Sequence, residues 1–193
     1  MSTGRVILAV LAVSAVGVAV IARSPLEQTM QRHMLMQLPM LFGAGMLLGH
    51  VVPWRGDVRA PWRGWNAQGG AGLLFASGVL ATWMVPRALD AAVEHAAIDA
   101  LKVLSLVAAG AIALSSWRVA SAIVRTFVIG NMAWMTATIG MLLLDAPVRL
   151  CASYGSSDQR ETGIAMIALT MAGVAGAAVH ALWAPRSLQA RAE

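Results

Sequence analysis

Residues 6–22 read VILAVLAVSAVGVAVIA, 17 residues without a charge, and Arg5 and Arg23 flank them. A helix that crosses a bilayer needs about 17–25 consecutive apolar residues. A basic start and an apolar core are also typical of a signal peptide. We interpret the stretch as the first membrane-spanning helix of the fold.

Five further apolar runs follow the first. They cover residues 34–52, 69–85, 100–117, 126–144 and 162–183. Only 12% of the 193 residues are charged, against about 25% in a soluble domain, and the mean hydropathy is +0.71. The sequence therefore predicts an all-α protein, a polytopic transmembrane bundle of six helices that forms a single integral membrane domain over residues 1–193.

The composition disfavours several classes of function. The net charge is +5, but the basic residues lie in short gaps between apolar runs, without the interleaved aromatics of a nucleic-acid-binding surface. We therefore expect the lipid bilayer as a partner and no nucleic acid. The chain has one cysteine, and a Cys/His cluster of the zinc or iron–sulfur kind is absent from the sequence. A base, a nucleophile and an orienting group do not occur together, so we do not expect an enzyme.

The basic residues also predict the orientation. Six spans place both termini on one side of the membrane. That side collects eight of the 14 Lys and Arg residues and the other side six, and three of the eight, Arg55, Arg59 and Arg63, share one loop. Short loops rich in Lys and Arg stay in the cytoplasm. We therefore predict a multi-pass protein of the plasma (inner) membrane with both termini in the cytoplasm.

Polar side chains gather on the other, outer side. His33, Gln37 and Met40 share one helix face, and Met30 lies one turn before His33. Imidazole and thioether groups are ligands that suit copper, and thioethers favour Cu(I). The candidate metal ligands are His33, Met30, Met36, Met40, Met84, Asp99 and Asp158.

Each of these residues also has a structural interpretation. Methionine is an ordinary filler of apolar cores. Lys102 can pair with Asp99 three residues earlier or extend its ammonium to the membrane interface, and Asp158 can cap a helix start. Asn131 is polar within an apolar run, so we expect it to face the bundle and to bond between helices.

Two pairs of small residues predict close helix contacts. They are Gly45 with Gly49 and Gly173 with Ala177, each four residues apart. This spacing lets helix backbones approach each other.

Four segments together resemble a known family. HMLMQ at 33–37 is similar to an HMLxH helix start, and WMVP at 83–86 is similar to a WHxP motif. Residues 88–103 resemble a stretch that runs from ALYDAA to HALEH, and 154–163 resembles an outer loop that ends in DQQLAG. The chain thus resembles, over roughly residues 26–185, the CtaG-type family of membrane proteins, which is associated with cytochrome c oxidase assembly and copper handling.

The departures from the family pattern concern its presumed metal ligands. Of the histidines in these motifs, only His33 is kept. The other positions hold Gln37, Met84, Asp99, Lys102 and Val103, while Asp158 and Gln159 of the DQ pair are kept. The resemblance implies the fold more strongly than it implies the copper function.

Three hypotheses follow. The first is a copper-holding assembly factor for cytochrome oxidase, with copper at the outer face. The alternative is a metal-free accessory or anchor subunit of a respiratory membrane complex. A small transporter ranks last, because ion pathways show charges in mid-membrane and these spans do not.

Overall fold

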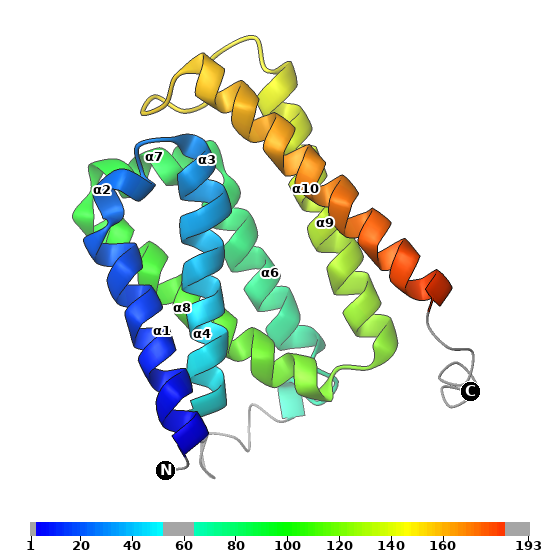
Figure 1. Cartoon of the computed structure of the whole chain (residues 1–193). Helices are drawn as coiled ribbons and strands as arrows, with labels where there is room; N and C mark the ends of the chain where they lie inside the picture. Colours follow the sequence, from blue (N-terminus) through cyan, green and yellow to red (C-terminus); the bar gives the residue numbers. More distant parts are fainter. Residues whose placement is uncertain (1–2, 52–63, 184–193) are drawn as a thin grey trace.

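The computed structural model describes residues 3–51 and 64–183, with side chains described up to residue 179, and every element in these ranges is a helix. The all-α prediction is confirmed. In chain order the helices are α1 (Thr3–Ile21), α2 (Arg23–Leu26), α3 (Met30–Arg32), the π-helix η1 (His33–Gln37), α4 (Leu38–Val51), α6 (Gly70–Met84), α7 (Pro86–Glu94), α8 (Ala96–Val119), α9 (Ala122–Asp145) and α10 (Ser156–Trp183), as Figure 1 shows.

Most of the predicted spans correspond to long apolar helices. In the described ranges, five helices are long and apolar enough to cross a membrane. The third predicted span is shorter, because α6 has only 15 residues, and α7 follows it at an angle of 72°. The two count as a sixth span only when taken together.

Pro86 causes this break. Proline lacks a backbone N–H and forces the preceding residue out of the helical region. Val85 accordingly adopts an extended conformation with ψ 125°, and Pro86 begins α7. Proline fits this first helical position, because the N–H there has no partner within the helix. The prediction that Pro86 closes the third span is confirmed.

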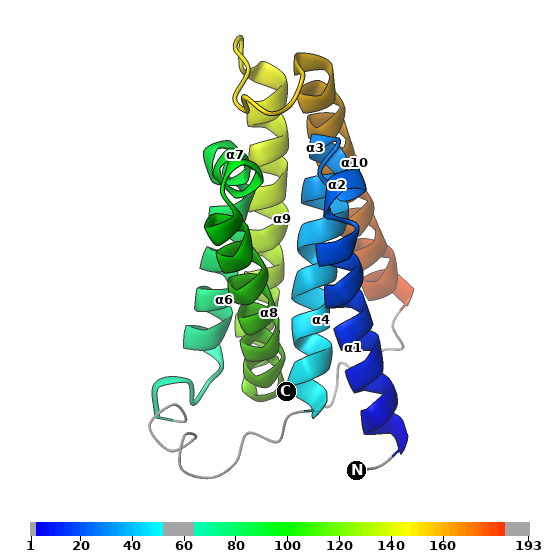
Figure 2. The same cartoon turned by 90° about the vertical axis from the view of Figure 1, so that its left-hand side faces the viewer.

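Helices α1, α4, α8 and α6 pack side by side in one bundle (Figure 2). Helices α4 and α8 approach each other closely. A Cβ atom on Gly45 would collide with the backbone of Val107, and one on Gly110 would collide with the carbonyl of Phe42. The prediction that Gly45 and Gly49 mark a helix contact is confirmed, since Gly49 faces the backbone of Ala111.

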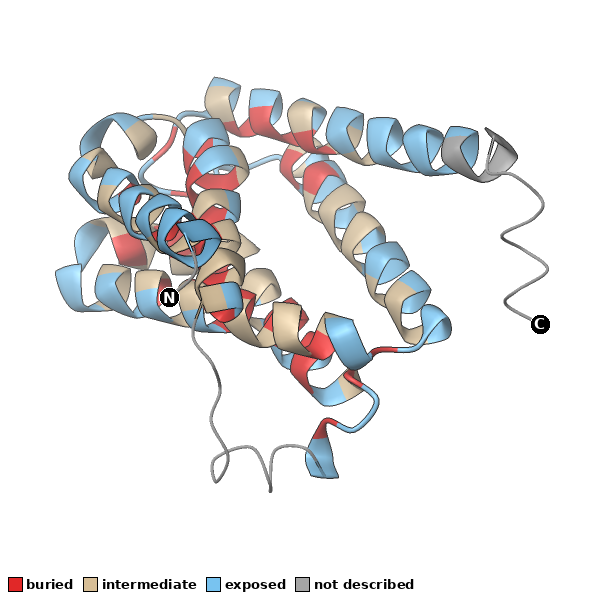
Figure 3. Cartoon of the chain, turned by 60° about the horizontal axis from the view of Figure 1, so that its bottom comes forward, coloured by how far each residue is buried: buried red, intermediate tan, exposed pale blue. Residues whose placement is uncertain are grey.

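Helices α9 and α10 form a hairpin beside this bundle (Figure 1). They pack against each other near their connecting loop, where Gly140 and Gly163 face each other. Residues 171–179 are all exposed (Figure 3).

The prediction that Gly173 and Ala177 mark a helix contact is wrong within the described chain. Nothing lies within 4 Å of a Cβ atom built on Gly173. Helix α10 separates from α9 toward its C-terminal end (Figure 3), so the surface around Gly173 is exposed in the described chain.

The connections define two ends of the molecule. Helices α2, α3 and α7 and the loop at 146–155 lie together at one end, which we call the outer end (Figure 1). Helix α1 begins at the opposite end, and α10 runs from the outer end toward it. Three of the arginines used to predict the orientation, Arg55, Arg59 and Arg63, lie outside the described residues.

Candidate functional site

A lysine side chain lies fully buried at the outer end. Lys102, in the second turn of α8, is 0% exposed. Its Nζ atom contacts four side-chain atoms: Glu27 Oε1, His33 Nε2 and Gln37 Oε1 at 2.9 Å each, and Asp99 Oδ1 at 2.8 Å. An ammonium group has three N–H donors. The first three partners accept hydrogen bonds, and Asp99 contributes a close opposite charge.

A second cation completes the charge balance. The Arg23 guanidinium donates to Glu27 at 2.7 Å and lies 3.2 Å from Asp99. It also donates to the carbonyls of Ala92 and Val93 at 2.9 and 3.0 Å. Two cations therefore face two carboxylates. Buried charges need such pairing because removal from water costs each of them several kcal/mol.

His33 connects Lys102 to the outer loop. Because an ammonium only donates, Nε2 of His33 must accept from Lys102, and the ring proton must be on Nδ1. Nδ1 lies 2.8 Å from the Tyr154 hydroxyl oxygen and donates to it. Both ring nitrogens are thus engaged. Gln37 adds a link to α1 by donating to the Ala19 carbonyl at 3.1 Å.

These seven side chains form one unit, which we call the outer cluster. It consists of Arg23, Glu27, His33, Gln37, Asp99, Lys102 and Tyr154. It joins α2, η1, α8 and the loop at 146–155.

The π-helix η1 positions two members of the cluster. His33 and Gln37 stand at its two ends and are both buried. The Leu38 N–H bonds to the His33 carbonyl, five residues back, which widens this turn. Pro39 follows directly and has no N–H for the Leu35 carbonyl, so a regular α-helical ladder could not continue here. Such π-turns occur frequently at functional sites.

The pKa of Glu27 reflects its surroundings. Burial raises the pKa of this carboxyl, but hydrogen bonds from Arg23 and Lys102 and the charge of Lys102 lower it by more. The net pKa lies below the ordinary value. Glu27 is therefore ionised at neutral pH and pairs with both cations.

The structure brings together only some of the predicted metal ligands. His33 and Asp99 converge, but on the ammonium of Lys102. Met30, three residues before His33, is also buried. Its backbone N–H donates to Asp158 Oδ2 at 2.6 Å. Asp158 thus joins the start of α3 to the start of α10.

The other three methionines have separate surroundings. Met36 is 57% exposed. Met40 and Met84 are partly buried against the apolar core. Among the described residues, no three His, Cys, Asp or Glu side chains are arranged to hold a metal ion. The donor set around Lys102 does not fit a copper ion while the ammonium is in place, and the copper site stays a prediction.

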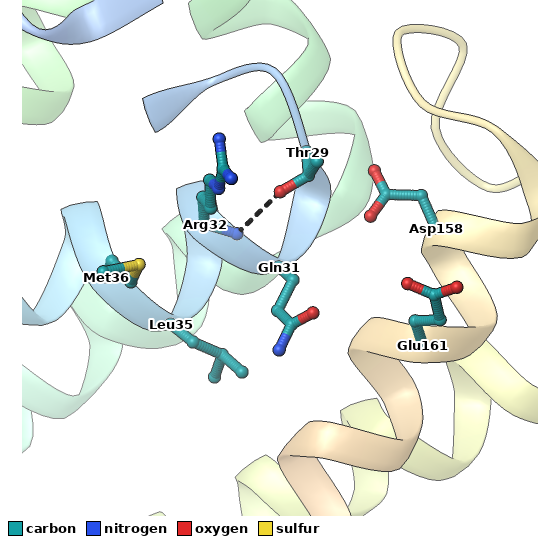
Figure 4. A pocket seen from close by; sticks show the side chains of 7 residues that line it. All are labelled: Thr29, Gln31, Arg32, Leu35, Met36, Asp158 and Glu161. Carbon is teal, nitrogen blue, oxygen red and sulfur yellow. Dashed lines mark hydrogen bonds between the residues drawn. The ribbon is translucent and has the colours of Figure 1, made fainter. Parts of the chain in front are cut away.

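Met36 and Asp158 do line a common groove at the outer end. It encloses about 330 Å³ between α3 with η1 on one side and α10 on the other (Figure 4). Its lining residues are Thr29, Gln31, Arg32, Leu35, Met36, Asp158 and Glu161. Asp158 and Glu161 face Gln31 across it (Figure 4). The groove carries both charge signs beside two apolar side chains.

Residues of the family-like segments serve as joints between helices. The Gln159 side chain donates to the Leu143 carbonyl at 3.1 Å and accepts from the Leu150 N–H at 2.8 Å. Trp83 donates to the hydroxyl of Ser105 at 2.8 Å. These bonds fasten α10 to α9, and α6 to α8.

Sequence reasoning found the pair of Lys102 and Asp99, which is confirmed, but missed the rest of the charge network. It does not identify Glu27, Arg23 or Tyr154 as site residues. One signal was present in the sequence. A lysine inside an apolar run needs an opposite charge at the same depth, and Glu27 lies in the outer connection before the second predicted span.

Comparison with known proteins adds no family to this description. No family model, no curated protein and no solved structure matches the chain. The resemblance to the CtaG type therefore stays a prediction that depends on the four segments.

Proposed function

We propose that this chain is a metal-free membrane protein of the CtaG type that acts as an accessory or assembly subunit of a respiratory complex, such as cytochrome c oxidase. The observation that carries the proposal is the position of the Lys102 ammonium. It lies among four oxygen and nitrogen atoms of the kind that could otherwise bind a metal ion. The family resemblance suggests the respiratory context, and the long apolar helices provide the membrane anchor.

The ammonium supplies the positive charge that Glu27 and Asp99 need. It is covalently attached to α8, so it cannot be released or passed to a partner. A metal carrier needs an ion that it can bind and release. A structural subunit needs only a permanent positive charge, and the side chain of Lys102 provides it. The charge balance of the outer cluster therefore favours the structural function.

The outer cluster also fixes the shape of the outer end. Lys102 joins α8 to Glu27 and His33, and His33 joins these to Tyr154 in the loop at 146–155. We propose that this rigid end faces the extracytoplasmic side of the plasma (inner) membrane, with both chain termini in the cytoplasm. The distribution of Lys and Arg supports this orientation.

The competing function is copper handling. It is favoured by Met30 and His33, which lie about one helical turn apart and are both fully buried. Nε2 of His33 accepts a hydrogen bond from the Lys102 ammonium. Copper binding there requires that this hydrogen bond breaks. The two functions thus differ in what the His33 ring binds.

A copper titration separates them. The purified protein and its His33→Ala variant would each compete with a Cu(I) chelator of known affinity. We expect neither protein to withdraw copper from the chelator. Tight binding by the wild type that is lost in His33→Ala would support copper handling and contradict our proposal.

The partner is tested separately. The chain would be tagged, extracted from its own membranes in mild detergent and analysed by mass spectrometry, with an unrelated multi-pass protein carrying the same tag as control. We expect oxidase or cytochrome subunits to be enriched with this chain alone. A preparation without any such subunit would contradict the proposed role.

A further inference from the structure

An amide side chain lies unpartnered near the middle of a membrane-spanning helix. Asn131 is the tenth of the 24 residues of α9, about 4 Å from the helix midpoint. It is exposed and makes no hydrogen bond to any described residue. The prediction that Asn131 faces the bundle is therefore wrong within the described chain. The bilayer interior holds no water that could bond this amide.

Asn131 belongs to a continuous exposed seam on α9. Successive seam residues are four and three positions apart in alternation, and all of them are exposed: Phe127, Asn131, Trp134, Thr138, Met141 and Asp145. This spacing is the heptad spacing of helices that pair along their length. Phe127 and Trp134, on either side of Asn131, are 70% and 71% exposed.

We propose that the α9 helices of two copies of this chain pair along this seam, with the two Asn131 side chains hydrogen-bonded to each other. Both copies enter the membrane in the same orientation, so a two-fold axis along the membrane normal places both side chains at the same depth. An amide carries donors and an acceptor, so two of them satisfy each other. One asparagine in an apolar seam is known to fix the register of a two-helix pair.

The rest of the seam fits a second copy. Phe127, Trp134 and Met141 are apolar and need no complementary polar group. The Thr138 hydroxyl already donates to the carbonyl of Trp134 at 2.9 Å. Asp145 ends the helix at the outer end, where water reaches it. Asn131 is thus the polar group of the seam within the membrane interior that still needs a partner, and its own equivalent is complementary to it.

The hairpin leaves room for such a contact. Gly130, next to the seam, has nothing within 4 Å of a built Cβ atom. Two predicted helix contacts are not made within the described chain, and both lie on the α9–α10 hairpin. They are the contact of Asn131 and the contact of the surface around Gly173. In the bundle, by contrast, Gly45 and Gly49 of α4 and Gly110 of α8 already pack against a neighbouring helix.

Cysteine cross-linking in membranes tests the pairing. The natural Cys151 would first be replaced by serine, which can keep the bond to the Pro86 carbonyl. Thr138→Cys then places a thiol in the seam. Leu104→Cys is the matched control, because Leu104 on α8 is 69% exposed and lies about as far from the outer end of its helix as Thr138 does.

We expect mild oxidation with iodine to give a disulfide-linked dimer at least tenfold more efficiently with Thr138→Cys than with Leu104→Cys. Adding Asn131→Leu should reduce this cross-link several-fold while the helix content measured by circular dichroism stays unchanged. Equal cross-linking of both cysteine variants would overturn the proposal, and so would a cross-link insensitive to Asn131→Leu. A dominant cross-link to a different protein would show another occupant and overturn it too. The readout does not depend on copper or on a respiratory partner.

Discussion

The outer cluster and the α9–α10 hairpin differ in whether their polar and small residues have partners within the chain. In the outer cluster, Lys102 and His33 have partners for all their polar atoms inside the same chain. On the hairpin, Asn131 and Gly173 have no partner among the described residues. A polar or small residue in an apolar helix is therefore not enough to predict a contact within the chain. Four predictions test how much the contacts within the chain contribute to its stability.

The largest effect is expected from Lys102→Met. The variant leaves two carboxylates facing the single cation Arg23 in a buried site. Removing one partner of a buried ion pair costs about 3–5 kcal/mol. Thermal unfolding in detergent should show a large loss of stability.

Arg160→Met is the control for this variant. Arg160 is an exposed cation on α10. Its replacement should change the free energy of unfolding by less than about 0.5 kcal/mol. Similar losses in both variants would show that the outer cluster contributes no more than surface charge.

The second prediction compares two glycines. Gly45→Ala places a Cβ atom against the backbone of Val107 and should destabilise the protein by about 1–3 kcal/mol. Gly173→Ala meets nothing in the described chain and should be neutral, or stabilise α10 by up to about 1 kcal/mol through helix propensity. Unfolding of the two variants in the same detergent decides this. A reversed order would contradict the packing of α4 on α8.

The third prediction concerns Tyr154. Tyr154→Phe removes the hydroxyl that accepts from His33, so one buried hydrogen bond is lost. We expect a loss of about 0.5–1.5 kcal/mol. Thr170→Val, which removes a hydroxyl bonded only within its own helix, is the control and should cost less. Equal losses would mean that the outer loop is not held by His33.

The smallest effect is a pH dependence. The pKa of Glu27 is lowered in the folded protein, so its ionised form contributes stability above the ordinary value of 4.5. That contribution should be lost as the pH falls below 4.5 and through the lower pKa of the folded state. Unfolding temperatures measured from pH 7 to pH 3 should fall less steeply for Glu27→Gln. Identical slopes for the two proteins would contradict the role of Glu27.

The helices could be predicted from the sequence, because a bilayer requires long uninterrupted apolar runs. The first run, for example, corresponds to α1 (Thr3–Ile21), and Pro86 ends α6 as expected. The pair of Lys102 and Asp99 was also predictable, since residues three apart share a helix face.

The rest of the outer cluster depends on contacts that no local pattern encodes. Glu27 reaches Lys102 across 75 positions, and Tyr154 reaches His33 across 121. The methionines suggested copper because their spacing is helical, yet Met36 is exposed. The prediction for Asn131 failed within the described chain because Asn131 lies on the exposed side of α9, whereas Val124 and Val128 of the same helix pack against the core of α6 and α8.

The central claim is that the buried ammonium of Lys102 balances the partly buried carboxylates of Glu27 and Asp99 at the outer end. A double-mutant cycle with Lys102→Met, Glu27→Gln and the double variant measures it most directly, by unfolding in one detergent. Each single variant leaves an unbalanced charge, whereas the double variant leaves Arg23 paired with Asp99. We predict that the double variant loses less stability than the sum of the single variants, by about 1–3 kcal/mol. Losses that simply add would contradict the claim.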